Sequence, residues 1–233
     1  MPRTLRPEQD AYGGLLLAAL EGRPAHEVME RDDGLVYAGD PSDYFAPFRR
    51  WPSTERRAMR FVRGRVLDVG CGAGRASLHL EGRGHEVVAI DESPGAVEVA
   101  RRRGVRDARL LALADVGPEL GRFDTILILR NNLGLAGRPE RGRALLRRLR
   151  AATTDRGRIV TDSVDPARID EEDMRDAAEH RFRVRFRDLA SPWFRYAMLA
   201  PGEWDAALAG SGWHVARILD GGEPRYAVVL ERD

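Results

Sequence analysis

The middle of the chain alternates short apolar segments with helical ones, and this alternation constrains the fold more than any other feature. We expect strands at residues 65–70, 85–91, 108–115, 123–130 and 157–164. Helices are expected at 73–82, from Ser93 to Arg103, and at 139–152. Continuously apolar strands separated by helices are typical of a parallel sheet covered by helices on both faces.

The flanking segments complete the expected architecture. Residues 1–60 are predicted to form an N-terminal helical cap, with a helix over Leu15–Leu20 that stops at Gly22. Residues 61–233 are predicted to form the core, and the segments around Gly221 and Gly222 a closing hairpin. The expected fold class is therefore α/β, with a doubly wound, mostly parallel seven-stranded sheet and an antiparallel C-terminal hairpin.

A strand insertion is expected around residues 181–199. Its first part, "RFRVRFRDL", alternates strictly, as a half-buried antiparallel strand would. The arginines on one of its faces are interpreted as the solvated side of an edge strand; they are Arg181, Arg183, Arg185 and Arg187.

Composition excludes several classes of protein. The 233 residues are 43% hydrophobic and 32% charged, as in a soluble globular domain. The net charge of +1 does not favour a nucleic-acid partner. No apolar run is long enough to span a bilayer, and the N-terminus lacks the pattern of a secretory signal, so we expect a cytoplasmic protein without a membrane partner. The excess of arginine, alanine and glycine suggests a GC-rich, bacterial source.

The stretch "VLDVGCGAGR" places three glycines directly after the first expected strand. A dinucleotide-binding turn needs a third glycine at position 75 or 77, where the chain has Arg75 and Ser77. A triphosphate-binding loop needs a lysine, and the chain contains none. Asp68 would repel a pyrophosphate and attract an ammonium group. The turn therefore suits a nucleoside ligand that carries positive charge and no phosphate.

These residues resemble the class I S-adenosylmethionine-dependent methyltransferases. The resemblance rests on "VLDVGCGAG", on the acid that ends "VVAID" (Asp91), on the acid that ends "LALAD" (Asp115), and on "FDTILIL" as the fourth strand. It covers about residues 60–233. It implies S-adenosyl-L-methionine as the cofactor and S-adenosyl-L-homocysteine as the product.

The resemblance also implies roles for single residues. Gly70 and Gly72 would let the backbone approach the cofactor, and Asp68 would bind the methionine amino group directly or through water. Asp91 would accept hydrogen bonds from the ribose hydroxyls. Further cofactor contacts are implied for Asp115 with Val116 at adenine, for Arg130 and Asn131 near the methionine end, and for Cys71 and Glu92 beside the two motifs.

Substrate contacts are expected beyond the carboxyl ends of the strands, at residues 130–137 and 162–170. Asn131 and Asn132 either orient a substrate or cap their loop. Aromatic residues of the cap and of "SPWFRY" either enclose a substrate or pack on the core; the pocket candidates among them are Tyr44, Trp51 and Trp193. We expect no metal, because Asp162 and Asp165 are better explained by the turn before Pro166.

The most favoured function is S-adenosylmethionine-dependent methyl transfer to an O or N atom of a small molecule, in bacterial specialised metabolism. An RNA or protein methyltransferase and a non-catalytic cofactor-binding scaffold remain alternatives. Neither a catalytic base nor an oligomeric state follows from the sequence, since the five histidines form no cluster.

Overall fold

The computed structural model describes residues 4–169 and 179–233. Two compact units share the chain and interleave along it. The first comprises Met1–Trp51, Asp68–Asp115 and His180–Phe194, and the second comprises Pro52–Leu67, Val116–Glu179 and Arg195–Asp233. The sequence predicted a boundary at residue 60 between a cap and a core. That boundary differs from the division into these two units and stays a prediction.

A seven-stranded sheet carries the fold, with strand order β10-β11-β7-β6-β3-β4-β5. Its strands are β3 (Val66–Val69), β4 (Val87–Asp91), β5 (Ala108–Leu110), β6 (Phe123–Ile128), β7 (Thr153–Val164), β10 (Trp213–Leu219) and β11 (Arg225–Arg232). β4 pairs with β5 and β6 with β7 in parallel, whereas β11 pairs antiparallel with β7 and β10. The predicted fold class, including the antiparallel hairpin, is confirmed.

The third predicted strand is shorter than expected. The sequence predicted a strand over 108–115, but β5 ends at Leu110 and a 3₁₀ turn covers Leu113–Asp115. β5 lies at the edge of the sheet and has one partner strand, so fewer hydrogen bonds extend it. This turn places Asp115 beyond the strand rather than in it.

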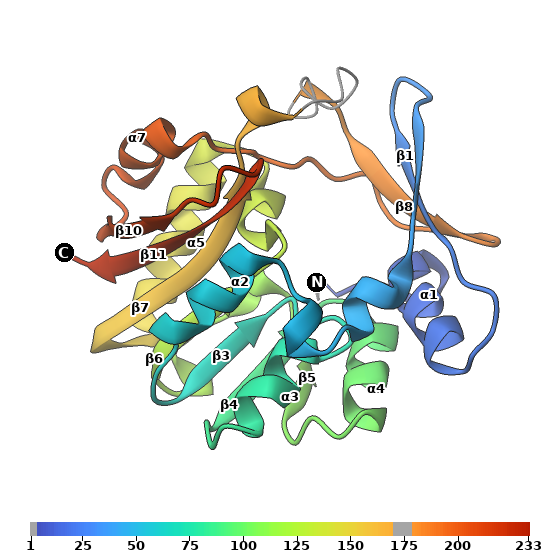
Figure 1. The fold of residues 1–233 in the computed structure, drawn as a ribbon, viewed down its shortest axis with the longest axis horizontal. Helices are drawn as coiled ribbons and strands as arrows, with labels where there is room; N and C mark the ends of the chain where they lie inside the picture. Colours follow the sequence, from blue (N-terminus) through green and yellow to red (C-terminus); the bar gives the residue numbers. More distant parts are fainter. Residues whose placement is uncertain (1–3, 170–178) are drawn as a thin grey trace. The chain divides into compact units, whose positions relative to one another are not determined.

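In the first unit, helix α1 (Ala11–Leu20) is apolar around almost its whole circumference, which is typical of a helix buried on several sides. One side packs on Ala73 and on α4 (Pro94–Arg102), and another packs on β8 (Phe182–Phe186). Figure 1 shows α1 beside both elements. A Cβ on Gly95 would lie 2.7 Å from the Gly13 backbone, so glycine lets the two helices approach this closely.

A second, four-stranded antiparallel sheet corrects two expectations. Its order is β2-β1-β8-β9, with β1 at Glu27–Arg31, β2 at Val36–Gly39 and β9 at Leu189–Ala190. The N-terminal segment is therefore not wholly helical. β8 is also not an edge strand, because β1 and β9 pair with its two sides. Its arginines form ion pairs across the sheet: Arg183 and Arg185 bind Glu30 at 2.8 and 2.9 Å.

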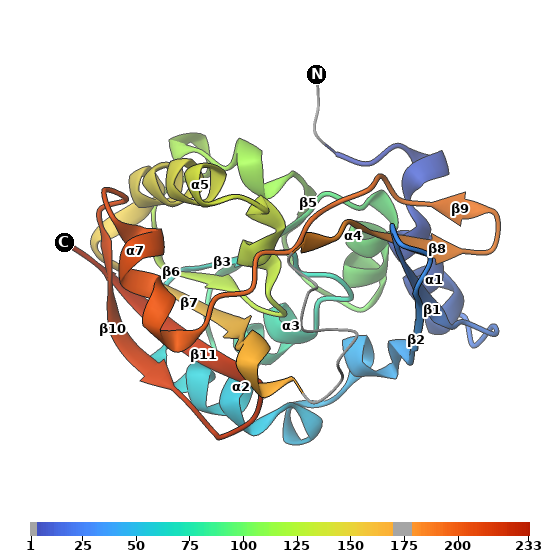
Figure 2. The same ribbon diagram turned by 90° about the horizontal axis from the view of Figure 1, so that it is seen from above.

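In the second unit, helices lie on both faces of strands β6, β7 and β11. Figure 2 shows α5 (Pro139–Ala151) on one face and α2 (Ser53–Ala58) on the other. The short helix α7 (Trp204–Leu208) precedes β10, and the Trp204 indole donates to the Tyr226 hydroxyl at 2.7 Å. Helix α3 (Arg75–Glu81) belongs to the first unit. None of the helices in the described ranges is long and apolar enough to cross a membrane.

Candidate functional site

The glycine turn after β3 is fixed to the end of the neighbouring strand β4. The amide groups of Gly70 and Cys71 both donate to the Ile90 carbonyl, at 2.9 and 3.0 Å. Gly70, Gly72 and Gly74 have positive φ angles of 68°, 52° and 75°. L-amino acids with side chains disfavour this conformation, which explains the G-x-G-x-G spacing without a dinucleotide.

Asp91 closes the turn from the end of β4. Its carboxylate accepts hydrogen bonds from the Gly72 and Ser93 amides at 2.9 and 3.0 Å. The side chain is only 7% exposed, and burial raises the pKa of Asp91 to about 6. An ionised carboxylate has about four acceptor positions, so Asp91 retains acceptor capacity for a ligand hydroxyl.

Asp68 is the second carboxylate of this region. It is buried in β3 and accepts a hydrogen bond of 2.6 Å from the Ser77 hydroxyl of α3. Burial, together with the nearby negative charge of Asp91, raises the pKa of Asp68 to about 6. Two buried carboxylates near one turn favour a cationic ligand over a phosphate.

Tyr12 of α1 covers the glycine turn and was not predicted from the sequence. A Cβ placed on Gly72 would lie 2.6 Å from the Tyr12 hydroxyl oxygen. Residue 72 therefore needs glycine for its φ angle and for the space that Tyr12 occupies. No local pattern could have identified Tyr12, because 60 positions of sequence separate it from Gly72 and only the packing of α1 brings it there.

The remaining predicted cofactor residues of the first unit differ in exposure. Cys71 is 7% exposed and packs with Ala89 and Val97, and burial raises the pKa of its thiol well above the usual range. Such a thiol is no nucleophile at neutral pH. Glu92 is exposed, and Asp115 is half-buried after β5.

In the second unit, Arg130 and Asn131 follow β6 in the left-handed conformation, with φ of 64° and 57°. The Asn131 amide donates to Asp162 at 2.7 Å, and its side chain donates to the Ala197 carbonyl at 3.1 Å. Asn131 is only 5% exposed, and these two hydrogen bonds hold the loop after β6 in its conformation. Asn132 is half-buried, and Val116 is fully buried.

A buried acid of α2 supports Arg130 and was not predicted. Glu55 is completely buried, and its Oε1 lies 4.0 Å from Arg130 Nη1. A single glutamate in a charged segment gives no sequence signal for such a role. Its burial beside Arg130, two residues after the end of β6, indicates that Glu55 helps to hold this loop in place.

The three aromatic pocket candidates lie in the first unit and have different surroundings. Trp51 is 3% exposed and packs under Arg75, whose Cζ lies 4.4 Å from the indole centroid. Tyr44 packs edge-on against Tyr12 and donates to Glu27 at 3.0 Å. Trp193 is 36% exposed, with the Arg183 Cζ 4.5 Å from its ring. Tyr44 and Trp193 therefore keep more surface for a ligand than Trp51.

The two aspartates near Pro166 have structural partners. Asp162 is 1% exposed and binds Arg225 at 2.7 Å, in addition to the Asn131 amide. Asp165 caps the turn Pro166–Arg168. Residue 170 of the expected substrate region lies outside the described residues. Within the described ranges, no three His, Cys, Asp or Glu residues are grouped as metal ligands would be.

The fold and the glycine turn together define a Rossmann-like methyltransferase of class I. A family model described as a methyltransferase domain matches residues 66–157. A crystal structure of a Bacteroides fragilis SAM-dependent methyltransferase with S-adenosyl-L-homocysteine superposes with a TM-score of 0.88. It is 29% identical and covers 98% of this chain and 97% of its own. The expected class, a SAM-dependent methyltransferase, is confirmed.

Two curated relatives match a shorter part of the chain. A magnesium-protoporphyrin O-methyltransferase from Rhodobacter capsulatus is 36% identical over 85 residues, which are 35% of this chain and 38% of that protein. A ubiquinone biosynthesis O-methyltransferase from Methylocella silvestris is 37% identical over 92 residues, 36% of each. The matches thus span less than two fifths of these two relatives.

Proposed function

We propose that this chain binds S-adenosyl-L-methionine and transfers its methyl group to an O or N atom of a small molecule. The observation that carries the proposal is the geometry at Gly72. Its amide binds Asp91 at 2.9 Å, and the Tyr12 hydroxyl occupies the space of the missing side chain. A turn that carries no side chain at residues 70, 72 and 74, beside a buried acid, suits a nucleoside that approaches the backbone closely.

The residues of the first unit fit the chemistry of this cofactor. The remaining acceptor capacity of Asp91 suits a ribose hydroxyl, and Asp68 offers negative charge to an ammonium group. When bound, the cofactor supplies a methyl group on a sulfonium, which is already an activated leaving group. The protein then has to align the acceptor atom with the methyl group and exclude water. Tyr12, which covers the turn, contributes to this exclusion.

The acceptor determines whether the enzyme needs a base. A neutral amine attacks without further help, whereas a hydroxyl must lose its proton to a group of suitable pKa. We assign no catalytic base. Tyr44, Trp193 and Asn132 stay our candidates for substrate contacts, and Arg130, Asn131 and Asp115 stay predicted cofactor contacts.

A small-molecule substrate from a bacterial biosynthetic reaction is the most specific part of the proposal. It is supported by the relatives named for magnesium-protoporphyrin and for ubiquinone biosynthesis. The net charge of +1 also gives no general attraction to RNA. Specialised metabolism is proposed on composition alone.

The test is transfer of label from [methyl-³H]S-adenosylmethionine to fractions of a bacterial extract. Small metabolites, RNA and protein are separated after incubation, and Asp91→Ala serves as the control that lacks the ribose contact. We expect label in the metabolite fraction with the wild type and loss of that label with Asp91→Ala. Label in RNA or protein would contradict the substrate class, and cofactor binding without any transfer would favour the scaffold alternative.

A further inference from the structure

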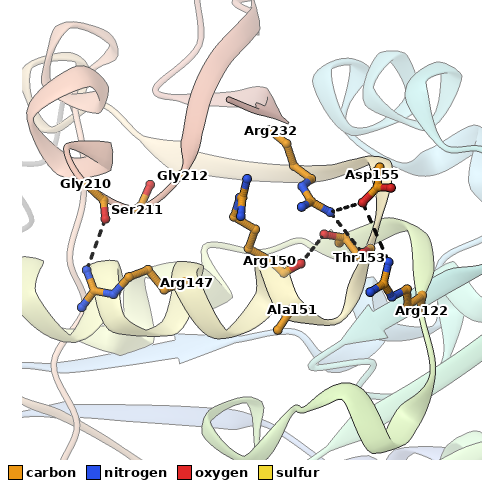
Figure 3. A pocket seen from close by; sticks show the side chains of 10 residues that line it. All are labelled: Arg122, Arg147, Arg150, Ala151, Thr153, Asp155, Gly210, Ser211, Gly212 and Arg232. Carbon is orange, nitrogen blue, oxygen red and sulfur yellow. Dashed lines mark hydrogen bonds and ion pairs between the residues drawn. The ribbon is translucent and has the colours of Figure 1, made fainter.

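A cavity in the second unit is lined by four arginines among ten residues and has no role in the proposed methyl transfer. Its volume is about 480 Å³. It lies where the end of α5, the start of β7, the turn before β10 and the end of β11 meet (Figure 3). The lining residues are Arg122, Arg147, Arg150, Ala151, Thr153, Asp155, Gly210, Ser211, Gly212 and Arg232.

The charges of this arginine cavity are unbalanced. The lining contains four arginines and a single carboxylate, that of Asp155, which gives it a net charge of +3. Asp155 lies 3.5 Å from Arg232 and 3.8 Å from Arg122, but its side chain is 88% exposed. Ion pairs this exposed are screened and weak, so Asp155 neutralises little of the positive charge.

Two of the arginines are held in place by backbone oxygens. Arg232 is 16% exposed and donates to the Thr153 and Thr154 carbonyls at 3.3 and 2.8 Å. Arg147 donates to the Gly210 carbonyl at 3.4 Å. These contacts fix the guanidinium groups without cancelling their charge, which is how a preformed anion site is built.

Arg150 lacks such a contact. Its Nε is buried, and its guanidinium forms no hydrogen bond or ion pair within residues 4–169 and 179–233. In Figure 3 it rises from α5 between Gly212 and Arg232, and no dashed line reaches its guanidinium. A Cβ on Gly212 would lie 2.7 Å from Arg150 Cδ, so glycine is needed for the side chain to pass. An unsatisfied, partly buried cation is costly, and an anion would recover that cost.

The helix dipole explains only part of this arrangement. Basic residues in the last turn of α5 interact favourably with its C-terminus, and this accounts for Arg148 and Arg150. It does not account for Arg122, which precedes β6, or for Arg232, which ends β11. Arginines from separate segments meet at one cavity, and the planar guanidinium binds tetrahedral oxyanions through paired hydrogen bonds.

We propose that the arginine cavity is a binding site for a phosphate-class oxyanion, either free or as the terminal group of a phosphorylated metabolite. None of its residues belongs to the predicted cofactor or substrate sets. The site is therefore independent of the methyl-transfer proposal.

The test is calorimetric titration with inorganic phosphate and with pyrophosphate at constant ionic strength. Arg150→Gln removes the unpaired cation, and Arg148→Gln removes an equal charge from the same helical turn outside the cavity lining. We expect saturable binding to the wild type and to Arg148→Gln, and binding at least tenfold weaker to Arg150→Gln. Stronger binding of pyrophosphate than of phosphate would favour the terminal group of a metabolite as the natural ligand.

Two results would overturn the proposal. One is the absence of saturable binding of either anion to the wild type, and the other is equal weakening in Arg148→Gln and Arg150→Gln. Circular dichroism checks that each variant is folded. If Arg150→Gln does not fold, Arg122→Gln replaces it, since the Arg122 side chain is 65% exposed and tolerates substitution. S-adenosylmethionine binding should be unchanged in all of these variants.

Discussion

Single residues of the glycine turn were predictable because their signal is local. Asp68, Gly70, Gly72 and Asp91 follow from the ends of two adjacent strands and from glycine spacing. Tyr12 could not be found in this way, because its contact with the turn depends on where α1 packs. The burial of Trp51 could not be predicted either, because an aromatic residue in a proline-rich loop is compatible with a ligand pocket and with a core position.

The contact between Gly72 and Tyr12 predicts a coupled pair of substitutions. Gly72→Ala should destabilise the protein by about 1–2 kcal/mol for the left-handed conformation alone, with a further cost from the clash with Tyr12. Tyr12→Phe removes the clashing oxygen, and the next ring atom would lie 3.7 Å from the new Cβ. A double-mutant cycle in urea should therefore show a favourable coupling of about 1 kcal/mol.

Gly84→Ala is the matched control for this cycle. Gly84 also has a positive φ, of 89°, but a Cβ there would meet nothing within 4 Å. Gly84→Ala should therefore show the destabilisation caused by the left-handed conformation and no coupling to Tyr12→Phe. Additive effects at Gly72 and Tyr12 would mean that the hydroxyl does not occupy this space in solution.

The raised pKa values of Asp68 and Asp91 predict a pH-dependent affinity for S-adenosylmethionine. Both are raised to about 6, and the ligand's cationic and hydroxyl groups need the ionised forms. Affinity should therefore increase from about pH 5 to about pH 7 and then level off. Titration of Asp91→Asn should show a shallower dependence, and an affinity that falls over this range in the wild type would argue against the assignment.

The stability of the ligand-free protein should depend on pH in the opposite direction. A carboxyl whose pKa is higher in the folded than in the unfolded protein stabilises the fold at low pH. That contribution is lost as the pH rises from about 4 to about 6. The difference in unfolding free energy between the wild type and Asp91→Asn separates the contribution of the Asp91 carboxyl from those of the other carboxyl groups. A difference that does not change between pH 4 and pH 6 would contradict burial of the Asp91 carboxyl.

At the scale of elements, the strands and helices of the large sheet were predictable, and the small sheet was not. β1 reads Glu-Val-Met-Glu-Arg, with charged residues at three of five positions. These charges are compensated by β8, where Arg183 binds Glu30, and no single segment reveals such a partner. β8 itself was recognised from its alternation, but its neighbours on both sides were not.

The contact between α1 and α4 should depend strongly on Asp10. Its buried carboxylate accepts hydrogen bonds from the Gly13 amide, the Ser93 hydroxyl and the Gly95 amide, at 2.9, 2.7 and 2.7 Å. Asp10→Ala leaves these donors unsatisfied and should cost about 2–4 kcal/mol in urea unfolding.

Asp40→Ala provides the comparison for Asp10. Asp40 also caps a short helical turn, through the Ser42 amide, but it lies at the surface. Its loss should cost no more than about 1 kcal/mol. Similar costs for the two substitutions would mean that the Asp10 network does not hold α1 against α4.

At the scale of the whole molecule, the sequence predicted the sheet class because buried parallel strands are continuously apolar. All residues of β3 and β4 are buried, whereas β2 alternates between exposed and half-buried positions. The division into units was not predictable, since chain segments far apart in sequence form each of them.

Hydrogen exchange should reproduce this difference in burial. We expect amides of β4 and β6 to exchange at least about tenfold more slowly than those of β2, whose Val36 is 57% exposed. S-adenosylmethionine should add protection at Gly70–Gly74 and around Asp91. Protection that appears only elsewhere on ligand addition would place the cofactor at another site.

The central claim is that the glycine turn and Asp91 bind S-adenosylmethionine. Calorimetric titration of the wild type and of Asp91→Ala with S-adenosylmethionine, S-adenosylhomocysteine and NAD tests it most directly. We predict that both adenosyl ligands bind the wild type, that NAD does not, and that Asp91→Ala binds them at least about tenfold more weakly while staying folded. Binding of NAD alone, or unchanged affinity in a folded Asp91→Ala, would contradict the account.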